Sequence, residues 1–299
     1  MRKSSPATEA PLPVVTRFAP SPTGRLHLGH AFSAIQAHDS ARARDGRFLL
    51  RIEDIDGTRS RPAFVAGIEE DLAWLGLGWD GPVVRQSERL DLYAAALARL
   101  EAEGLVYPCF CTRAEIAREA AASLSAPHGP EGPIYPGTCA RLDPATRAAR
   151  SREPHSWRLD MAAAVARAGP LTWTDEIAGV VTTDPLAHGD VILARKDAPA
   201  SYHLAVTVDD AAQGVTHVVR GADLFAATHV HRLLQALLGL PTPTYRHHPL
   251  LTDAEGNRLA KRHGAPTLAD LRAGGIDGRA LAQDLRAGRL PTGFARANA

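Results

Sequence analysis

Apolar segments of strand length alternate with helix-like segments along the first eighty residues. Val14–Phe18 and Phe48–Ile52 each predict a buried strand, because short apolar runs bounded by turn residues are typical of parallel sheets. Residues 31–44 have the composition of a helix, and residues 61–77 predict an amphipathic helix. Strands that alternate with helices indicate an α/β fold, so we expect a doubly wound parallel sheet of the Rossmann type.

The middle of the chain departs from this alternation. Residues 140–190 mix polar and apolar stretches with frequent proline and glycine, which predicts the remainder of an inserted α+β subdomain. The parallel pattern resumes with a strand at Val191–Arg195, a helix that begins at Ser201–Leu204, and a strand at Val215–Val219. We therefore expect five parts: a disordered tail (1–13), two halves of the parallel-sheet domain (14–106 and 190–256), the insertion (107–189), and a loop with C-terminal helices (257–299).

Composition narrows the class of protein. The 299 residues are 45% hydrophobic, which is enough for a buried core, and the net charge of +1 neither demands nor excludes nucleic acid. No apolar run approaches the roughly 18 residues of a membrane span, and residues 1–13 lack the apolar segment of a signal peptide. We therefore expect a cytoplasmic protein. Lysine is rare beside arginine, which draws attention to Lys261.

The segment from Arg17 to His30 joins the first strand to the first helix and carries two histidines. A helix N-terminus presents unpaired N–H groups, which attract phosphate. His27 and His30 are three residues apart on one side of the first turn, and Gly29 leaves the backbone bare enough for a nucleotide to lie close. In isolation, the pattern is equally compatible with ordinary loop histidines.

Charged residues stand at the ends of several expected strands. Glu53 follows the second strand, where open α/β sheets bind their ligands, and a carboxylate there can hold an ammonium group. Arg17 and Arg220 also stand at strand ends, and a guanidinium fork matches a carboxylate. For each residue alone, a solvated position remains the alternative.

The three cysteines indicate a metal site. Cys109 and Cys111 are separated by one residue, and Cys139 follows a loop with glycine and proline. Structural zinc takes four ligands, mostly thiolates or imidazoles, so the cysteines leave one ligand to be found. Tyr135, His128 and water are the candidates. The alternative is three buried, reduced thiols without a metal.

The string RFAPSPTGRLHLGH at 17–30 resembles the first signature of the class I aminoacyl-tRNA synthetases, and within them the glutamyl branch. RIEDID at 51–56, YHLAVTVDD at 202–210 and GVTHVVRG at 214–221 resemble further blocks of that branch. The resemblance implies ATP-dependent activation of L-glutamate to glutamyl-adenylate, with Mg²⁺ accompanying the ATP. It implies that glutamate is bound by Arg17, Phe18, Ala19, Pro20, Ser21, Glu53, Tyr202 and Arg220. It implies that ATP is bound by His27, Gly29, His30 and Lys261, of which His27, His30 and Lys261 are catalytic.

Three positions depart from the family pattern. Residues 257–264 resemble the second class I signature, K-M-S-K-S, with Lys261 at its second lysine, but Arg258 replaces the first lysine and Ala260 replaces the serine. A lysine on a loop of this kind can stabilise the charge that builds on a triphosphate. Val206 stands where ordinary glutamyl-tRNA synthetases usually have asparagine, so we expect a reduced affinity for glutamate.

The pattern C-x-C followed by Y-x-x-x-C resembles one subgroup, the truncated glutamyl-queuosine tRNA(Asp) synthetases. In that subgroup the tyrosine is a zinc ligand, which implies one structural zinc bound by Cys109, Cys111, Tyr135 and Cys139. About 35 residues follow Gly264, so we expect no anticodon-binding domain. The resemblance implies transfer of glutamate to queuosine in the anticodon of tRNA(Asp), by a monomer that grips the anticodon stem-loop. The alternatives are a conventional glutamyl-tRNA synthetase that charges a tRNA 3′ end, and a catalytically idle tRNA-binding paralogue.

Overall fold

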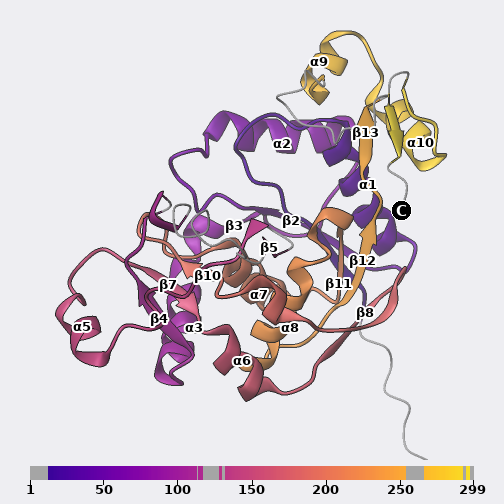
Figure 1. The fold of residues 1–299 in the computed structure, drawn as a ribbon. Coiled ribbons are helices and arrows are strands. Elements are labelled where there is room, and N and C mark those ends of the chain that lie inside the picture. The colour runs from indigo at the N-terminus through magenta and orange to yellow at the C-terminus, as the bar shows by residue number, and fades with distance from the viewer. Residues whose placement is uncertain are drawn as a thin grey trace, which may run out of the picture.

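Two groups of parallel strands form the centre of the fold in this computed structural model (Figure 1). It describes residues 13–112, 114–116, 128–129, 132–253, 266–291 and 294–296. The first group has the order β1-β2-β3 and comprises β1 (Val15–Phe18), β2 (Arg47–Ile52) and β3 (Val84–Arg85). The second has the order β11-β12-β8-β9 and comprises β8 (Thr172–Asp175), β9 (Gly179–Thr182), β11 (His217–Gly221) and β12 (Thr244–His248). In this group β11, β12 and β8 are parallel, and the edge strand β9 is antiparallel to β8. The backbone N–H of Thr216 donates to the carbonyl of Val15 at 3.0 Å, so β11 begins beside β1.

The helices belong to two hydrophobic clusters, of which the first covers the strands β1 and β2. One cluster packs α1 and α2 against β1 and β2, and the other joins α3, α7 and α8. Their bounds are α1 (Leu28–Arg42), α2 (Pro62–Trp74), α3 (Leu90–Ala102), α7 (Tyr202–Ala212) and α8 (Ala227–Leu237). The strands and helices expected before residue 80, and the helix after Ser201, are therefore confirmed, with shifts of a few residues at their ends. Among the described residues, no helix has the length and apolar character that crossing a membrane requires.

The inserted part contains a separate antiparallel sheet. Its order is β10-β7-β4, with β4 (Val106–Cys109), β7 (Ser156–Leu159) and β10 (Ile192–Ala194). The expectation that Val191–Arg195 rejoins the parallel sheet is therefore wrong. A three-residue apolar strand fits either kind of sheet, so the neighbouring strand decides its place. Conversely, β8 lies within the stretch expected to be inserted, yet it pairs with β12 in parallel.

Shorter elements complete the insertion and the loops around it. They are β5 (His128–Gly129), β6 (Gly132–Pro133), α5 (Pro144–Ala149), α6 (Met161–Ala168), η1 (Gln86–Glu88), η2 (Pro185–His188) and η3 (Ala222–Leu224). Figure 1 shows α5 at the outer edge of the insertion, beside β4 and β7. The insertion therefore extends to one side of the parallel strands.

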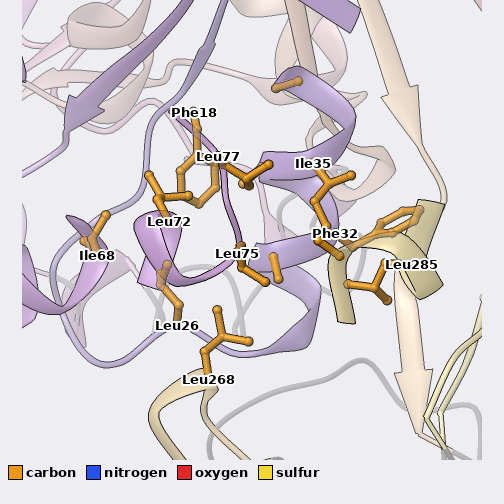
Figure 2. Packing of buried hydrophobic residues seen from close by; sticks show 14 of the residues in the cluster. Phe18, Leu26, Phe32, Ile35, Ile68, Leu72, Leu75, Leu77, Leu268 and Leu285 are labelled. Carbon is orange, nitrogen blue, oxygen red and sulfur yellow. The ribbon is translucent and has the colours of Figure 1, made fainter. Parts of the chain in front are cut away.

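The C-terminal elements pack on the first helices. They are β13 (Leu251–Asp253), α9 (Leu268–Ala273), α10 (Gly278–Arg286) and β14 (Phe294–Arg296). Leu268 and Leu285 join the cluster that contains Leu26 and Phe32 (Figure 2). The backbone N–H of Leu268 also donates to the carbonyl of Leu26 at 2.9 Å. The chain on the C-terminal side of residues 254–265 is thus fixed beside the loop that follows β1.

Candidate active site

One cavity of about 770 Å³ lies at the carboxyl ends of β1, β2 and β11, where open α/β sheets bind ligands. Its walls include every described residue that the sequence assigned to glutamate or ATP. These are Arg17, Phe18, Ala19, Pro20, Ser21, His27, Gly29, His30, Glu53, Tyr202 and Arg220. Lys261, with Arg258 and Ala260, lies outside the described residues. Val206 is buried in α7 and lines neither this cavity nor the second one described below.

The two histidines cap the N-terminus of α1. His27 is the N-cap residue, and its Nδ1 accepts the backbone N–H of Gly29 at 3.1 Å. The Nδ1 of His30 accepts the backbone N–H of His27 at 3.2 Å. Because Nδ1 is an acceptor in both rings, the neutral rings carry their proton on Nε2. The ring centroids are 3.8 Å apart, so two such donors lie side by side at the positive end of a helix dipole.

Gly29 is needed for this geometry. A Cβ added at Gly29 would lie 3.1 Å from Cε1 of His27 and 3.2 Å from its Nδ1, which is closer than ordinary contact. A side chain at this position would therefore push on the capping ring. The sequence predicted a bare backbone here for a nucleotide, and the structure adds a second reason for glycine.

Arg220 is a buried cation whose hydrogen-bond partners are neutral. Its Nε donates to Nε2 of His247 at 3.1 Å, and one terminal nitrogen contacts the hydroxyl of Tyr202 and Nδ1 of His231, each at 3.3 Å. The other terminal nitrogen donates to the hydroxyl of Thr228 and to a main-chain carbonyl. Among the described residues, no carboxylate forms an ion pair with Arg220, although its side chain is only 5% exposed. Because an unpaired buried charge is costly, this position favours an anionic ligand.

The imidazoles around Arg220 stay neutral at physiological pH. Burial and the Arg220 cation together lower the pKa of His247 to about 4, although its contact with Asp175 opposes this shift. Burial, together with the same cation, lowers the pKa of His231 well below its usual value. Nδ1 of His247 donates to Asp175 at 2.7 Å, which leaves Nε2 as the acceptor for Arg220. Among the described residues that surround this end of the cavity, Arg220 therefore supplies the positive charge.

Arg17, in contrast, is paired. Its Nε donates to Oδ1 of Asp210 at 3.0 Å, and the Asp210 carboxylate also contacts Arg51 at 2.7 Å. Arg51 reaches Oε1 of Glu53 at 3.3 Å. Burial raises the pKa of the Glu53 carboxyl, while the cations of Arg51 and Arg17 oppose that rise. The cavity wall thus presents the carboxylates of Glu53 and Asp223 together with the guanidinium groups of Arg17 and Arg220.

A second site is formed by the three thiols of the insertion. The sulfur atoms of Cys109, Cys111 and Cys139 lie within 4.8 Å of one another, an arrangement that could hold a metal ion. The Tyr135 hydroxyl lies 3.5 Å from the sulfur of Cys109 and 3.4 Å from that of Cys111. Burial raises the pKa of the Cys111 thiol to about 12 and also raises that of the Tyr135 phenol. Three sulfurs and one oxygen therefore converge as a donor set of the kind that zinc accepts.

Another cavity, of about 470 Å³, lies between the two sites. It shares Ser21, Glu53 and Tyr202 with the first cavity, and Tyr135 and Arg158 line it from the insertion. The guanidinium carbon of Arg158 lies 3.8 Å from the centroid of the Tyr135 ring. A ligand in this cavity would contact the amino-acid end of the first cavity and the insertion together.

Several residues of the site were not predicted from the sequence. Arg51 and Asp210 lie inside motifs that it considered, and His231 and His247 surround Arg220. One signal was available, because Arg51 interrupts an apolar strand and a charge on a buried strand needs a partner. No pattern of the sequence indicated that the histidines of α8 and β12 meet at one arginine.

Comparison with known proteins identifies the family. The catalytic domain of the class I tRNA synthetases (E and Q) matches residues 13–285. A glutamyl-Q tRNA(Asp) synthetase of Rhodobacter capsulatus is 53% identical over 269 residues, which are 88% of this chain and 96% of that protein. The protein of the same name from Symbiobacterium thermophilum is 51% identical, over 87% of this chain and 81% of its own length.

Solved structures agree with these sequence matches. A glutamate tRNA ligase of Elizabethkingia meningosepticum, crystallised in complex with its amino acid, is 28% identical with a TM-score of 0.71. The glutamate-tRNA synthetase of Elizabethkingia anophelis is 27% identical with a TM-score of 0.77. The matches cover 88% and 91% of this chain, but 53% and 61% of those longer proteins. The chain belongs to the class I tRNA synthetases (E and Q), on the branch of the glutamyl-Q tRNA(Asp) synthetases.

Proposed function

We propose that this protein activates L-glutamate with ATP and transfers it to the queuosine nucleoside in the anticodon of tRNA(Asp). The α-carboxylate of glutamate attacks the α-phosphorus of ATP, which gives glutamyl-adenylate and releases pyrophosphate. A hydroxyl of the nucleoside then attacks the activated carbonyl carbon and releases AMP. A carboxylate is already a nucleophile, so positioning and electrostatics supply the rate of the first step without a general base.

The choice of glutamate as the substrate rests on one observation, the charge of Arg220 that has no carboxylate partner among the described residues. Asp210 and Glu53 balance the charges of Arg17 and Arg51, whereas no carboxylate in the described part of the chain forms an ion pair with Arg220, so its cation remains for the ligand. Glutamate carries one net negative charge at neutral pH, whereas glutamine carries none. The cavity therefore favours glutamate, with its carboxylates near the two arginines of the cavity wall and its ammonium group near Glu53.

The nucleotide occupies the end of the cavity that the histidine pair forms. The Nε2–H groups of His27 and His30 donate to phosphate oxygens, and the backbone at Gly29 lets the nucleotide approach. Lys261 adds its charge from the segment that follows β13. This assignment is supported by the position of Thr267, which pairs with His27 on the far side of that segment. Mg²⁺, bound with ATP, would neutralise phosphate charge.

The cavity next to the insertion receives the acceptor nucleoside. Its shared wall, with Ser21, Glu53 and Tyr202, brings an acceptor hydroxyl close to the carbonyl of the adenylate. One structural zinc, held by Cys109, Cys111, Tyr135 and Cys139, would fix the fold of the insertion beside this cavity. The anticodon stem-loop of tRNA(Asp) then lies against the insertion. These assignments are supported by the names of the relatives that the chain matches over most of their length.

Transfer of labelled glutamate tests this function. Bulk tRNA is prepared from cells that make queuosine and from otherwise identical cells that cannot, and each pool is incubated with the protein, ATP and labelled glutamate. We expect labelling of the queuosine-containing pool only, and no labelling with glutamine. Equal labelling of both pools would identify a conventional glutamyl-tRNA synthetase. No labelling and no ATP–pyrophosphate exchange would identify a tRNA-binding protein without catalysis.

A further inference from the structure

Four charged side chains of alternating sign run from one wall of the first cavity to another. Glu53 and Arg17 line the cavity, while Arg51 and Asp210 are absent from its walls and lie behind them. The guanidinium of Arg51 contacts Glu53 at 3.3 Å and Asp210 at 2.7 Å. The Asp210 carboxylate accepts the Nε–H of Arg17 at 3.0 Å. In space, the order of this row of side chains is therefore carboxylate, guanidinium, carboxylate, guanidinium.

The two inner members are charged and almost without solvent. Arg51 is fully buried, and Asp210 is 7% exposed. Burial tends to raise the pKa of Asp210, but the cations of Arg17 and Arg51 outweigh it and hold that pKa below its usual value. Ionised groups in such surroundings are stable only when each has a close partner of opposite charge. Asp210 lies between Arg17 and Arg51, and Arg51 pairs with Glu53 and Asp210 and, at 3.8 Å, with Asp209. For each inner residue, one of these partners lines the cavity.

The geometry of these contacts sets the direction of the outer groups. A guanidinium is planar and rigid, so fixing one edge determines where the other edge points. Asp210 engages the Nε of Arg17 and lies 3.5 Å from one terminal nitrogen, while the other terminal nitrogen contacts the carbonyl of Val219. The remaining N–H groups of Arg17 are left for the cavity that this residue lines. Arg51 acts in the same way on Glu53, because it holds one of its carboxylate oxygens.

We propose that Arg51 and Asp210 are positioning residues of the amino-acid site, which together fix the separation and orientation of Glu53 and Arg17. The inference rests on the proposed function, since the fixed pair recognises the ammonium group and a carboxylate of one amino acid. Neither inner residue touches the substrate. Because the outer groups are held before the amino acid arrives, its binding does not have to order them.

Two conservative substitutions test the proposal. R51K keeps the charge but loses the fork that spans Glu53 and Asp210. D210N keeps the shape but removes the negative charge that lies between the two arginines, and its amide nitrogen cannot accept a hydrogen bond. KM values for glutamate and for ATP are measured by ATP–pyrophosphate exchange, with the substrate tRNA present. We expect KM for glutamate to rise by about tenfold or more in each variant, since small misplacements of binding groups have effects of this size. KM for ATP should change less than about twofold.

D209N is the matched control, because it removes an equally buried charge from the neighbouring residue. Asp209 accepts from Gln86 at 2.8 Å, from Arg89 at 2.7 Å and from Tyr93 at 2.7 Å, and it contacts neither Glu53 nor Arg17. Its Oδ2 lies 3.8 Å from Nε of Arg51. We expect a loss of thermal stability in D209N similar to that in D210N, with a change in glutamate KM below about threefold.

A pH profile separates positioning from a purely structural role. Glu53 faces the cations Arg51 and Arg17, the Asp210 carboxylate and the Tyr202 phenol. R51M removes the nearest cation, so the pKa of Glu53 rises and a larger fraction of it is protonated near neutral pH. KM for glutamate in R51M should therefore fall as the pH is raised from about 6 to about 8, while that of the unaltered protein changes little. If R51M does not fold, the R51K and D210N measurements decide alone.

The outcomes keep the two proposals apart. An unaltered protein without glutamate-dependent exchange overturns the proposed function. The positioning role is overturned if the unaltered protein is active and the R51K and D210N variants fold but keep their glutamate KM within about threefold of its value. It is also overturned if the glutamate KM of D209N rises as much as that of D210N. A rise confined to R51K and D210N supports the positioning role.

Discussion

Arg220 gives the sharpest prediction, because its charge has no carboxylate partner among the described residues. In R220M, the cavity loses the group that we assign to a substrate carboxylate. Hydrogen bonds to charged groups are worth about 1.5–3 kcal/mol, so KM for glutamate should rise roughly 10- to 150-fold. KM for ATP should stay nearly constant, because Arg220 lies among Tyr202, His231 and His247, away from the histidines that cap α1.

ATP–pyrophosphate exchange at varied glutamate and varied ATP measures both constants, and thermal unfolding with and without glutamate reports binding separately. R246M is the matched control, since Arg246 lies on the neighbouring strand and pairs with Glu176 at the surface. The stability of R220M without glutamate should fall little, because the substitution removes an unpaired buried charge along with its hydrogen bonds. A glutamate KM that R220M leaves unchanged, or an equal rise in both KM values, would refute the assignment of the unpaired charge to the substrate.

Three further predictions concern other parts of the molecule. G29A should raise KM for ATP several-fold more than KM for glutamate, because the added methyl presses on His27, and kinetics with either substrate varied will check this. Metal analysis should find zinc in the unaltered protein and none in C139S. A chelator should therefore lower the melting temperature of the unaltered protein and have little effect on that of C139S. Stability should fall as the pH drops from about 6.5 towards about 4, because the folded state holds the pKa of His247 low and so binds fewer protons than the unfolded state. H247Q should flatten the dependence of the melting temperature on pH in that window.

The local elements of the chain follow from short-range patterns. The apolar run ending at Phe18, the turn residues after it and the helix-forming composition of residues 31–44 were enough to predict β1 and most of α1, because a strand, a turn and a helix depend mostly on neighbours in sequence. The phosphate-binding interpretation of His27 and His30 came from the same local argument. The structure places both rings at the start of the helix, as that argument requires.

The assignment of strands to sheets was harder to predict from the sequence. A run such as Ile192–Ala194 has no feature that distinguishes a parallel from an antiparallel neighbour, and its partner β7 lies more than thirty residues away. The same applies to β8, whose single apolar residue, Trp173, gave no indication that the strand pairs with β12. Strand order in these cases depends on which surfaces remain to be buried after the longer elements have packed.

The sequence by itself determined the chemistry of the candidate site: two histidines at a helix start, an acid and two arginines at strand ends, and three cysteines with a tyrosine. Only the tertiary structure decided which of these charges are already paired. Arg17 and Arg220 look alike as residues at strand ends, yet Arg17 contacts Asp210, whereas the described hydrogen-bond partners of Arg220 are neutral groups. The physical reason is that the interaction energy of a charge depends on the groups within a few ångströms of it. For Arg17, the partner carboxylate comes from a segment nearly 200 residues away in the sequence.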